Sequence, residues 1–278
     1  MVIREQRPRV LSEILYMTLS IPIKPGSYHR FLPTIDFEKR IVEATVMYEY
    51  LKEVYRRGYE LGRGSRSPRA LELGKLLKEV YKRVMEEIEE RPLAGLSAAA
   101  MLVSSIVGYS DAASKSVMDA LPVAINVALY RGGPADAIEF IEGLEAVGHS
   151  ELLGRLDEKG LGRSRLAVES RSLGDLFEAL SDLDYGFKLN LRNYSEVLEY
   201  YRIASRAGSV TQALLEVYIE ALSRSLGVKA RREDSMRDLA KLDKSLRLRG
   251  IVMDKLLGIT YASVALAFVE GRIGKLFP

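Results

Sequence analysis

The amino-acid sequence predicts an almost wholly α-helical protein that folds as one domain over residues 1–278, and three observations support this prediction. Apolar residues recur at helical spacing along most of the chain. No stretch alternates apolar and polar residues with β-branched enrichment, as a half-buried strand would. Proline and glycine divide the chain into helix-sized pieces, and no change of composition marks a domain boundary.

The N-terminal half contains four predicted helices. The first covers about residues 8–20 and ends before Pro22, because a proline disfavours helix in the residue that precedes it. The second has Asp36 as its predicted N-cap. A polar turn at 62–68 separates it from the third, whose apolar face consists of Leu73, Leu76, Leu77, Val80, Val84 and Ile88. Pro92 begins a fourth helix made of small residues.

The C-terminal half is less regular at first. Gly132-Gly133-Pro134 is predicted to end a helix, and glycines interrupt short helical segments between residues 148 and 193. Asp182 and Asp184 lie in this region beside Tyr185-Gly186. Such a loop could hold a ligand, but turn formation explains the two aspartates equally well. Helical spacing resumes at about Ser195 and continues almost to the end of the chain.

The composition narrows the classes of function. The chain has no cysteine, so disulfides and thiolate catalysis are excluded, and with two histidines a histidine-rich zinc site is excluded as well. Its 41 basic and 38 acidic residues give a net charge of only +3. We therefore expect no nucleic-acid partner, since such binders carry a clustered basic excess. A soluble, cytoplasmic protein is the expected class.

We expect no membrane span and no signal peptide. The two most apolar stretches are 93–107 and 256–269. The first is predicted to be too short to cross a bilayer, which takes about 20 residues, and it is rich in alanine and serine. The second is typical of a buried helix in a packed bundle.

One segment is chemically suggestive, Lys24-Pro25-Gly26-Ser27-Tyr28-His29-Arg30. Gly26 permits a tight turn and close approach of a ligand. Lys24 and Arg30 could bind phosphate oxygens, the first as a point charge and the second as a bidentate fork. The alternative is a structural turn between helices, with its charges facing water.

The segment resembles the K-P-G-N-V-H-R motif of archaeal members of the ATP:dephospho-CoA triphosphoribosyltransferase family. Residues 241–251, KLDKSLRLRGI, resemble that family's ELDxxLRxRGI helix end. Residues 261–271, YASVALAFVEG, are similar to its closing helix, AAALFLALLEG. The matches occur in the same order and span nearly the whole chain.

The resemblance implies an all-helical transferase in which an acceptor hydroxyl displaces adenine from Mg-ATP, so that the triphosphoribosyl group is transferred. Lys24, Gly26, Ser27 and Arg30 would bind the nucleotide. His29 and Asp36 would be the catalytic candidates. Its partners would be a nucleotide or a CoA-like small molecule, and self-association into a homo-oligomer is left open.

Three family motifs are replaced in this chain. The P-D-[ST]-L-I-x-R-K element corresponds to residues 225–231, SLGVKAR, which lack its acidic residue. The N-T-N-L-G motif corresponds to Arg91-Pro92-Leu93-Ala94-Gly95, which keeps only the glycine, and the N-P-G-T-x-A-D stretch corresponds to residues 251–257, whose single acid is Asp254. The sequence therefore predicts either a divergent transferase or a catalytically inactive relative that binds a ligand or a partner.

Glu43 is the candidate metal ligand. It precedes an apolar stripe, at the place of a buried polar residue of the family, and a carboxylate suits Mg²⁺. The alternative is a glutamate on a solvated helix face.

Overall fold

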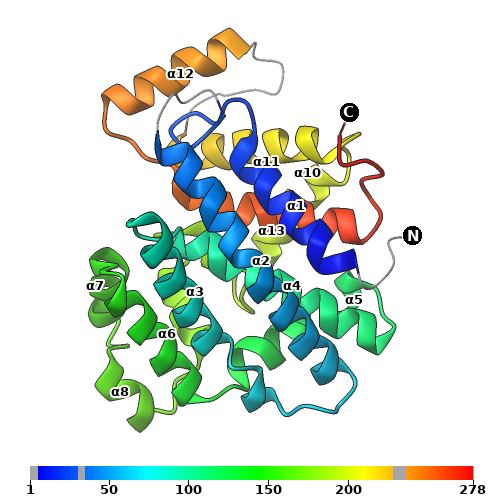
Figure 1. Ribbon diagram of the computed structural model, residues 1–278, viewed down its shortest axis with the longest axis vertical. Helices are drawn as coiled ribbons and strands as arrows, with labels where there is room; N and C mark the ends of the chain where they lie inside the picture. The colour runs from blue at the N-terminus through cyan, green and yellow to red at the C-terminus, as the bar shows by residue number, and fades with distance from the viewer. Residues whose placement is uncertain (1–5, 31–34, 228–235, 278) are drawn as a thin grey trace.

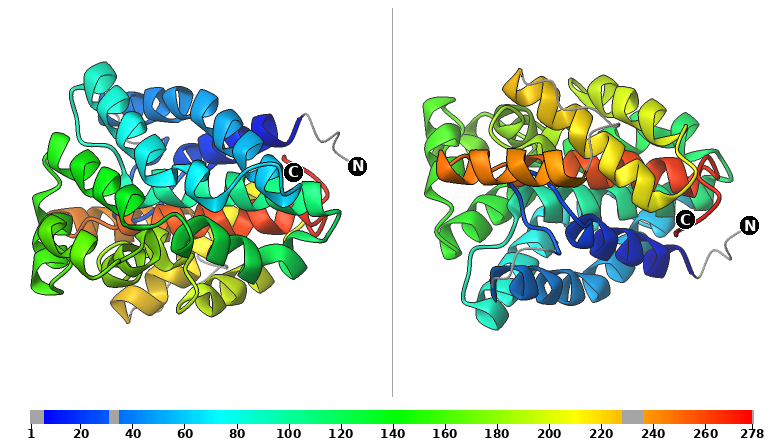
Figure 2. Two further views of the ribbon diagram at one scale, coloured as in Figure 1. Left: turned by 90° about the horizontal axis from the view of Figure 1, so that it is seen from below. Right: turned by 90° about the horizontal axis from the view of Figure 1, so that it is seen from above.

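The computed structural model describes residues 6–30, 35–227 and 236–277. This part of the chain is all-helical and contains no strand, which confirms the predicted fold class. Figure 1 and Figure 2 show its helices packed into one body. In chain order the α-helices are α1 (Arg7–Ser20), α2 (Ile35–Gly62), α3 (Leu73–Ile88), α4 (Ala94–Ala113), α5 (Val117–Ile125), α6 (Pro134–Ala146), α7 (Ser150–Glu158), α8 (Arg163–Val168), α9 (Leu173–Leu180), α10 (Tyr194–Ala204), α11 (Val210–Leu226), α12 (Met236–Leu248) and α13 (Leu257–Val269).

Short turns of tighter or wider helix join several of these elements. They are η2 (Pro68–Leu71), the π-helical η3 (Asn126–Tyr130), η4 (Tyr185–Lys188) and η5 (Asp254–Leu256). The helices end where proline and glycine predict: α1 ends before Pro22, and the region between residues 148 and 193 contains only short helices. One boundary differs, because α2 begins at Ile35 and therefore includes Asp36, the expected N-cap.

Helices α4 and α13 form the centre of the molecule. Every residue of α4 from Ala94 to Gly108 is buried, and so is every residue of α13 from Leu257 to Ala267. Figure 2 shows both helices enclosed by the others. A helix that is apolar around its whole circumference has no face for water, and it is stable only inside a protein core or a membrane.

Small residues let α2 and α4 approach until their backbones touch. A Cβ added to Gly58 would lie 2.2 Å from the carbonyl oxygen of Ser105, and one added to Gly108 would lie 2.2 Å from that of Tyr55. Neither position has space for a side chain. This contact fixes α4 along the length of α2 and thereby places the first turn of α4.

Helix α4 is longer than the sequence suggested. It continues past residue 107 to Ala113, since Gly108 allows it to remain packed on α2. At 20 residues it is the one helix, within the described ranges, that is long and apolar enough to cross a membrane. In this structure 78% of the most apolar 18-residue stretch of α4 is buried by the rest of the protein. This burial is typical of the core helix of a bundle.

Helix α12 lies at one end of the molecule, apart from the main bundle (Figure 1). Its buried residues are Leu239, Asp243 and Leu246. Leu239 packs on Ile23, while Asp243 accepts a hydrogen bond from the Gly26 amide. Helix α12 is therefore packed against the loop between α1 and α2.

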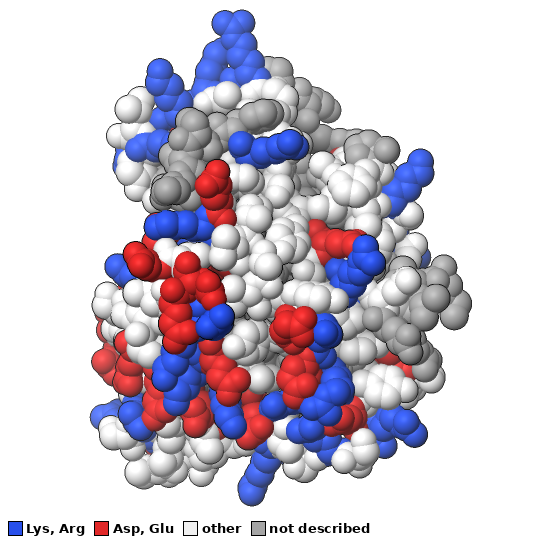
Figure 3. All heavy atoms as spheres, viewed as in Figure 1, with Lys and Arg blue, Asp and Glu red and all other residues white. Residues whose placement is uncertain are grey.

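The surface carries interleaved charges of both signs. Figure 3 shows acidic and basic side chains mixed over one face of the molecule, most densely in its lower half. On α2, Glu53 forms ion pairs with Arg56 and Arg57, each at 2.7 Å. This pattern agrees with the small net charge.

Candidate functional site

The side chain of Lys24 is enclosed by protein. It is 0% exposed, and its ammonium donates hydrogen bonds to the carbonyl oxygens of Thr18 and Leu19, the second at 3.0 Å. These carbonyls belong to the last turn of α1, which has no backbone donors left to pair them. Burial lowers the pKa of Lys24 to about 7, and the nearby Asp254 carboxylate opposes that shift. The ammonium expected at a nucleotide phosphate is thus engaged by the end of α1.

Gly26 and Ser27 attach the loop to two segments from the far end of the chain. The Gly26 amide donates to Oδ1 of Asp243 at 2.8 Å, and its carbonyl accepts from the Met253 amide at 2.7 Å. Glycine is required here, because its φ is 78° and an added Cβ would lie 2.9 Å from the Met253 side chain. The Ser27 hydroxyl donates to Oδ1 of Asp254 at 2.6 Å. Both loop residues therefore hold tertiary contacts.

His29 forms a cluster with the buried Asp243 and the exposed Arg247. Nε2 of His29 lies 3.3 Å from Oδ2 of Asp243, and Nε of Arg247 donates to both oxygens of that carboxylate, at 3.0 and 2.9 Å. Burial acts to raise the pKa of Asp243, but hydrogen bonds from His29, Arg247 and the Gly26 amide lower it below its usual value. The cluster connects the loop to α12.

The remaining loop candidates lie elsewhere. Arg30 is exposed, and its amide donates to the Ile21 carbonyl at 3.4 Å. Asp36 belongs to the first turn of α2, but its side chain lies outside the described residues. Of the six residues predicted for nucleotide binding or catalysis, the structure brings Lys24, Gly26, Ser27 and His29 into one buried network.

Glu43 is 1% exposed and forms an ion pair with Arg40, with 2.7 Å between Oε2 and Nη1. Its other oxygen accepts the Leu93 amide, at 2.7 Å, at the start of α4. Burial raises the pKa of Glu43, and the Arg40 charge opposes the shift. Arg40 also lies over the Tyr28 ring, 4.9 Å from its centroid. No group of three or more His, Asp or Glu side chains suited to a metal ion occurs in the part of the chain that the structure describes.

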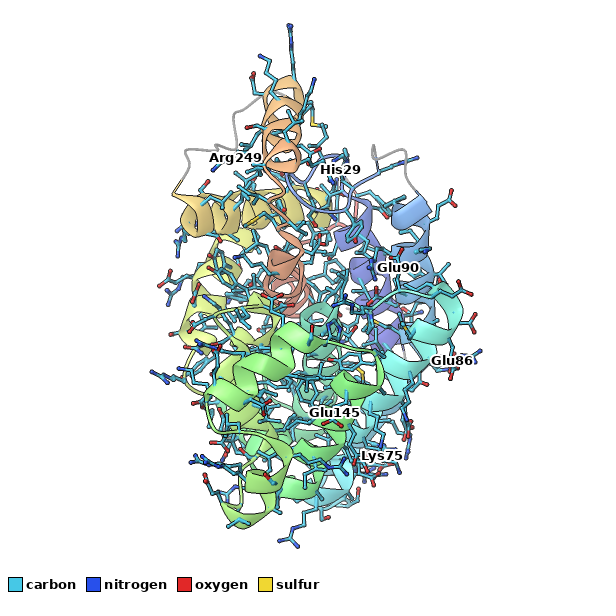
Figure 4. The ribbon with its side chains drawn as sticks, turned by 90° about the vertical axis from the view of Figure 1, so that its left-hand side faces the viewer. His29, Lys75, Glu86, Glu90, Glu145 and Arg249 are labelled. Atoms are coloured by element: carbon cyan, nitrogen blue, oxygen red, sulfur yellow. The ribbon has the colours of Figure 1, made fainter. Side chains whose placement is uncertain are left out.

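A cavity of about 440 Å³ lies beside this network. It is lined by residues from the start of α4, from the turn before α7, from the turn around η4 and from the segment before α13. The polar ones used below are Arg91, His149, Asp184, Asp254 and Lys255. Figure 4 shows this side of the molecule, with His29 and Arg249 near α12, Glu90 below them and Glu145 farther down on α6.

Asp184 is held on the cavity wall by two backbone amides. Oδ2 accepts the Gly95 amide at 3.2 Å, and Oδ1 accepts the Gly186 amide at 2.9 Å. Burial raises the pKa of Asp184 to about 7; the two amides and Lys255 lower it, and the Asp254 carboxylate raises it. Burial also raises the pKa of Asp254. The cavity therefore contains two carboxyl groups that hold a proton at a higher pH than ordinary aspartates do.

His149 is a neutral side chain at this site. Burial lowers its pKa to about 4, although its hydrogen bond to the Pro92 carbonyl opposes the shift, and the charges of Arg91 and Arg40 lower it further. Nε2 lies 3.0 Å from that carbonyl oxygen and donates to it, which leaves Nδ1 as the acceptor nitrogen.

Sequence patterns did not identify Arg40, His149 or Asp243 as members of this site. Arg40 could have been found from its position three residues before Glu43, on the same face of a helix. Asp243 stands four residues before its partner Arg247, but its contact with His29 spans 214 residues of sequence. His149 carries no comparable local signal, because its partner is 57 residues away in the chain.

Comparison with protein-family models, with curated protein sequences and with solved structures finds no match to this chain. The family expected from the quoted segments therefore stays a prediction.

Proposed function

We propose that the cavity binds Mg-ATP and that the protein transfers a triphosphoribosyl group from it to a hydroxyl of a CoA-like acceptor. One observation carries this proposal. Three segments at positions of family motifs, residues 24–30, 91–95 and 251–257, are far apart in the sequence and come together at one place. Residues of the second and third line the cavity, and the first is bonded to Asp254 on its wall.

Arg91 and Lys255 are the groups proposed to meet the phosphates. Both line the cavity, and neither forms an ion pair with any residue in the described ranges. Cations without a carboxylate partner are available to phosphate oxygens. In this proposal Lys24, Ser27 and His29 act as positioning residues, since Nζ of Lys24, Oγ of Ser27 and Nε2 of His29 are bonded to the protein.

The carboxyl groups fit a metal that arrives with the nucleotide. Mg²⁺ in phosphate-transfer sites keeps several waters and is commonly bound by one or two protein carboxylates together with substrate phosphates. Asp184 and Asp254 both line the cavity and could fill that role. The protein therefore does not have to supply all the ligands of the ion, because phosphates and waters supply the others.

A second candidate, a protein that binds the nucleotide without turnover, is favoured by the start of α4. There Glu43 and Asp184 accept the amides of Leu93 and Gly95, and the segment 91–95 has no side-chain amide. The positions that would otherwise meet substrate are filled by the protein's own carboxylates.

Incubation with ATP, Mg²⁺ and dephospho-CoA, followed by chromatography for free adenine, separates the candidates. The transferase releases adenine, and a binding protein shows a thermal shift with Mg-ATP but no adenine. Arg91→Ala combined with Lys255→Ala should weaken Mg-ATP binding about tenfold or more, since charge-assisted hydrogen bonds contribute about 1.5–3 kcal/mol each. Lys82→Ala, an exposed lysine on α3, is the matched control. Neither adenine nor a thermal shift would reject both candidates.

A further inference from the structure

The backbone of residues 91–95, which runs along the cavity wall into α4, is held by side chains of other elements. Glu43 of α2 accepts the Leu93 amide at 2.7 Å. Asp184 accepts the Gly95 amide at 3.2 Å. The first amides of any helix have no partner within the helix. Capping of α4 is therefore a sufficient explanation for these two carboxylates.

Two further side chains hold carbonyl oxygens that lie before the helix. Nη1 of Arg40 donates to the Arg91 carbonyl at 2.9 Å, and Nε2 of His149 donates to the Pro92 carbonyl at 3.0 Å. Capping does not explain these bonds, because the unpaired groups at the start of a helix are amides and not carbonyls. The two donors fix consecutive peptide units at Arg91 and Pro92, both of which line the cavity.

Arg40 is itself held in place. It is 5% exposed, and its guanidinium forms ion pairs with Glu43 at 2.7 Å and with Glu90 at 3.2 Å. Glu90 directly precedes Arg91 in the chain, so Arg40 contacts two successive residues of the segment that leads to the cavity. A guanidinium has five N–H donors in a fixed plane and can bond all three partners at once, whereas a lysine ammonium is a point charge.

We propose that Arg40 and His149 are positioning residues for Arg91, whose guanidinium meets the phosphates of the ligand. The inference rests on the proposed binding of Mg-ATP in the cavity and applies with or without turnover. The Arg91 side chain is exposed, and no ion pair or side-chain hydrogen bond joins it to the part of the chain that the structure describes. Its location therefore depends on its main chain, and a main chain fixed before the ligand arrives lowers the entropy cost of binding.

The test is a double-mutant cycle on the full chain, with Mg-ATP affinity measured by titration calorimetry for the wild type, His149→Phe, Arg91→Ala and the double variant. His149→Phe keeps an aromatic ring beside Tyr81, whose ring lies 6.3 Å from that of His149, and it removes the donor to Pro92. It should weaken binding about threefold or more when Arg91 is present and less than about twofold when Arg91 is alanine, because residues that act through one another are not additive.

Arg40→Lys gives a second, independent cycle. Lysine keeps a positive charge opposite Glu43 but lacks the fork that also reaches the Arg91 carbonyl, so the same loss and the same dependence on Arg91 are expected. Asp136→Ala is the control for destabilisation alone. Its carboxylate accepts the Gly74 amide at 2.8 Å, at the start of α3, and does not line the cavity. This variant should lower the Tm and leave Mg-ATP binding unchanged.

The outcomes separate this inference from the proposed function. A wild type that does not bind Mg-ATP rejects both. When the wild type binds, equal weakening by His149→Phe with and without Arg91 rejects the positioning role alone, in favour of direct contact between His149 and the ligand. Wild-type affinity in His149→Phe and Arg40→Lys, or in Arg91→Ala, also rejects it. Should Arg40→Lys not fold, the His149 cycle decides, since His149 is only half-buried.

Discussion

Lys24 carries its amino group into the interior of the protein, where the carbonyl oxygens of Thr18 and Leu19 receive it. A buried lysine loses the hydration of its charge, so its pKa falls. The side chain keeps three donors when charged and two when neutral, and two suffice for these carbonyls. Lys24, which the sequence suggests for phosphate binding, therefore caps the C-terminal end of α1.

The pH dependence of stability should reveal this lysine. Its pKa is about 7 in the folded protein and near 10.5 in the unfolded chain. Between these values the unfolded chain binds the additional proton, so the free energy of unfolding gains a contribution that rises with pH. In Lys24→Met this contribution is absent, and two carbonyls lose their donor, which costs about 1–3 kcal/mol.

Urea unfolding of the wild type and Lys24→Met at several pH values above 7 measures this difference. The stability gap between the two proteins should widen as pH rises. Lys82→Met, which changes an exposed lysine, should show a gap that does not vary with pH. A constant gap for Lys24→Met would mean that the buried side chain keeps its proton.

At the scale of elements, α12 depends on one polar cluster and a few apolar contacts. Asp243 joins it to the Gly26 amide and to His29, and Arg247 reaches the Ser27 carbonyl at 2.5 Å. The same loop is bonded to Asp254 through Ser27. The position of α12 is therefore linked to the cavity wall through residues 24–30.

Removing the Asp243 charge should loosen α12 before any other helix. Asp243→Asn leaves His29 and Arg247 without their carboxylate partner, and losing one partner of a largely buried pair is destabilising. Because Arg247 is partly exposed, solvent screening reduces the effect. Amide hydrogen exchange in α12 should accelerate about tenfold or more, with α4 and α13 unchanged. Lys244→Ala, an exposed change on α12, is the control; equal exchange in both variants would contradict the cluster's role.

At the scale of the whole molecule, the central pair α4 and α13 connects elements from both ends of the chain. Tyr261 of α13 donates to the Leu11 carbonyl of α1, at 3.3 Å, and Ser263 donates to the Val197 carbonyl of α10, also at 3.3 Å. No helix of this core can separate without exposing α4 or α13 to water. This arrangement favours unfolding in one step.

Thermal unfolding should accordingly give a single transition. The chain has 15 tyrosines and no tryptophan, and Tyr81, Tyr200, Tyr218 and Tyr261 are buried in four different helices. Tyrosine absorbance and far-ultraviolet circular dichroism should therefore report the same midpoint. Two separated midpoints would show that the molecule contains independently unfolding parts.

Local sequence patterns were enough to predict the all-helical class, the approximate ends of helices such as α1 and the irregular region between residues 148 and 193. Helical periodicity, proline and glycine act over a few residues, so they can be recognised without knowing the fold. Which charged groups contact each other depends on the packing of the helices. Lys24 caps α1, Ser27 reaches Asp254 across 227 residues of sequence, and Asp184 faces the cavity beneath the start of α4. These contacts depend on how distant segments pack, so patterns that extend over a few residues do not reveal them.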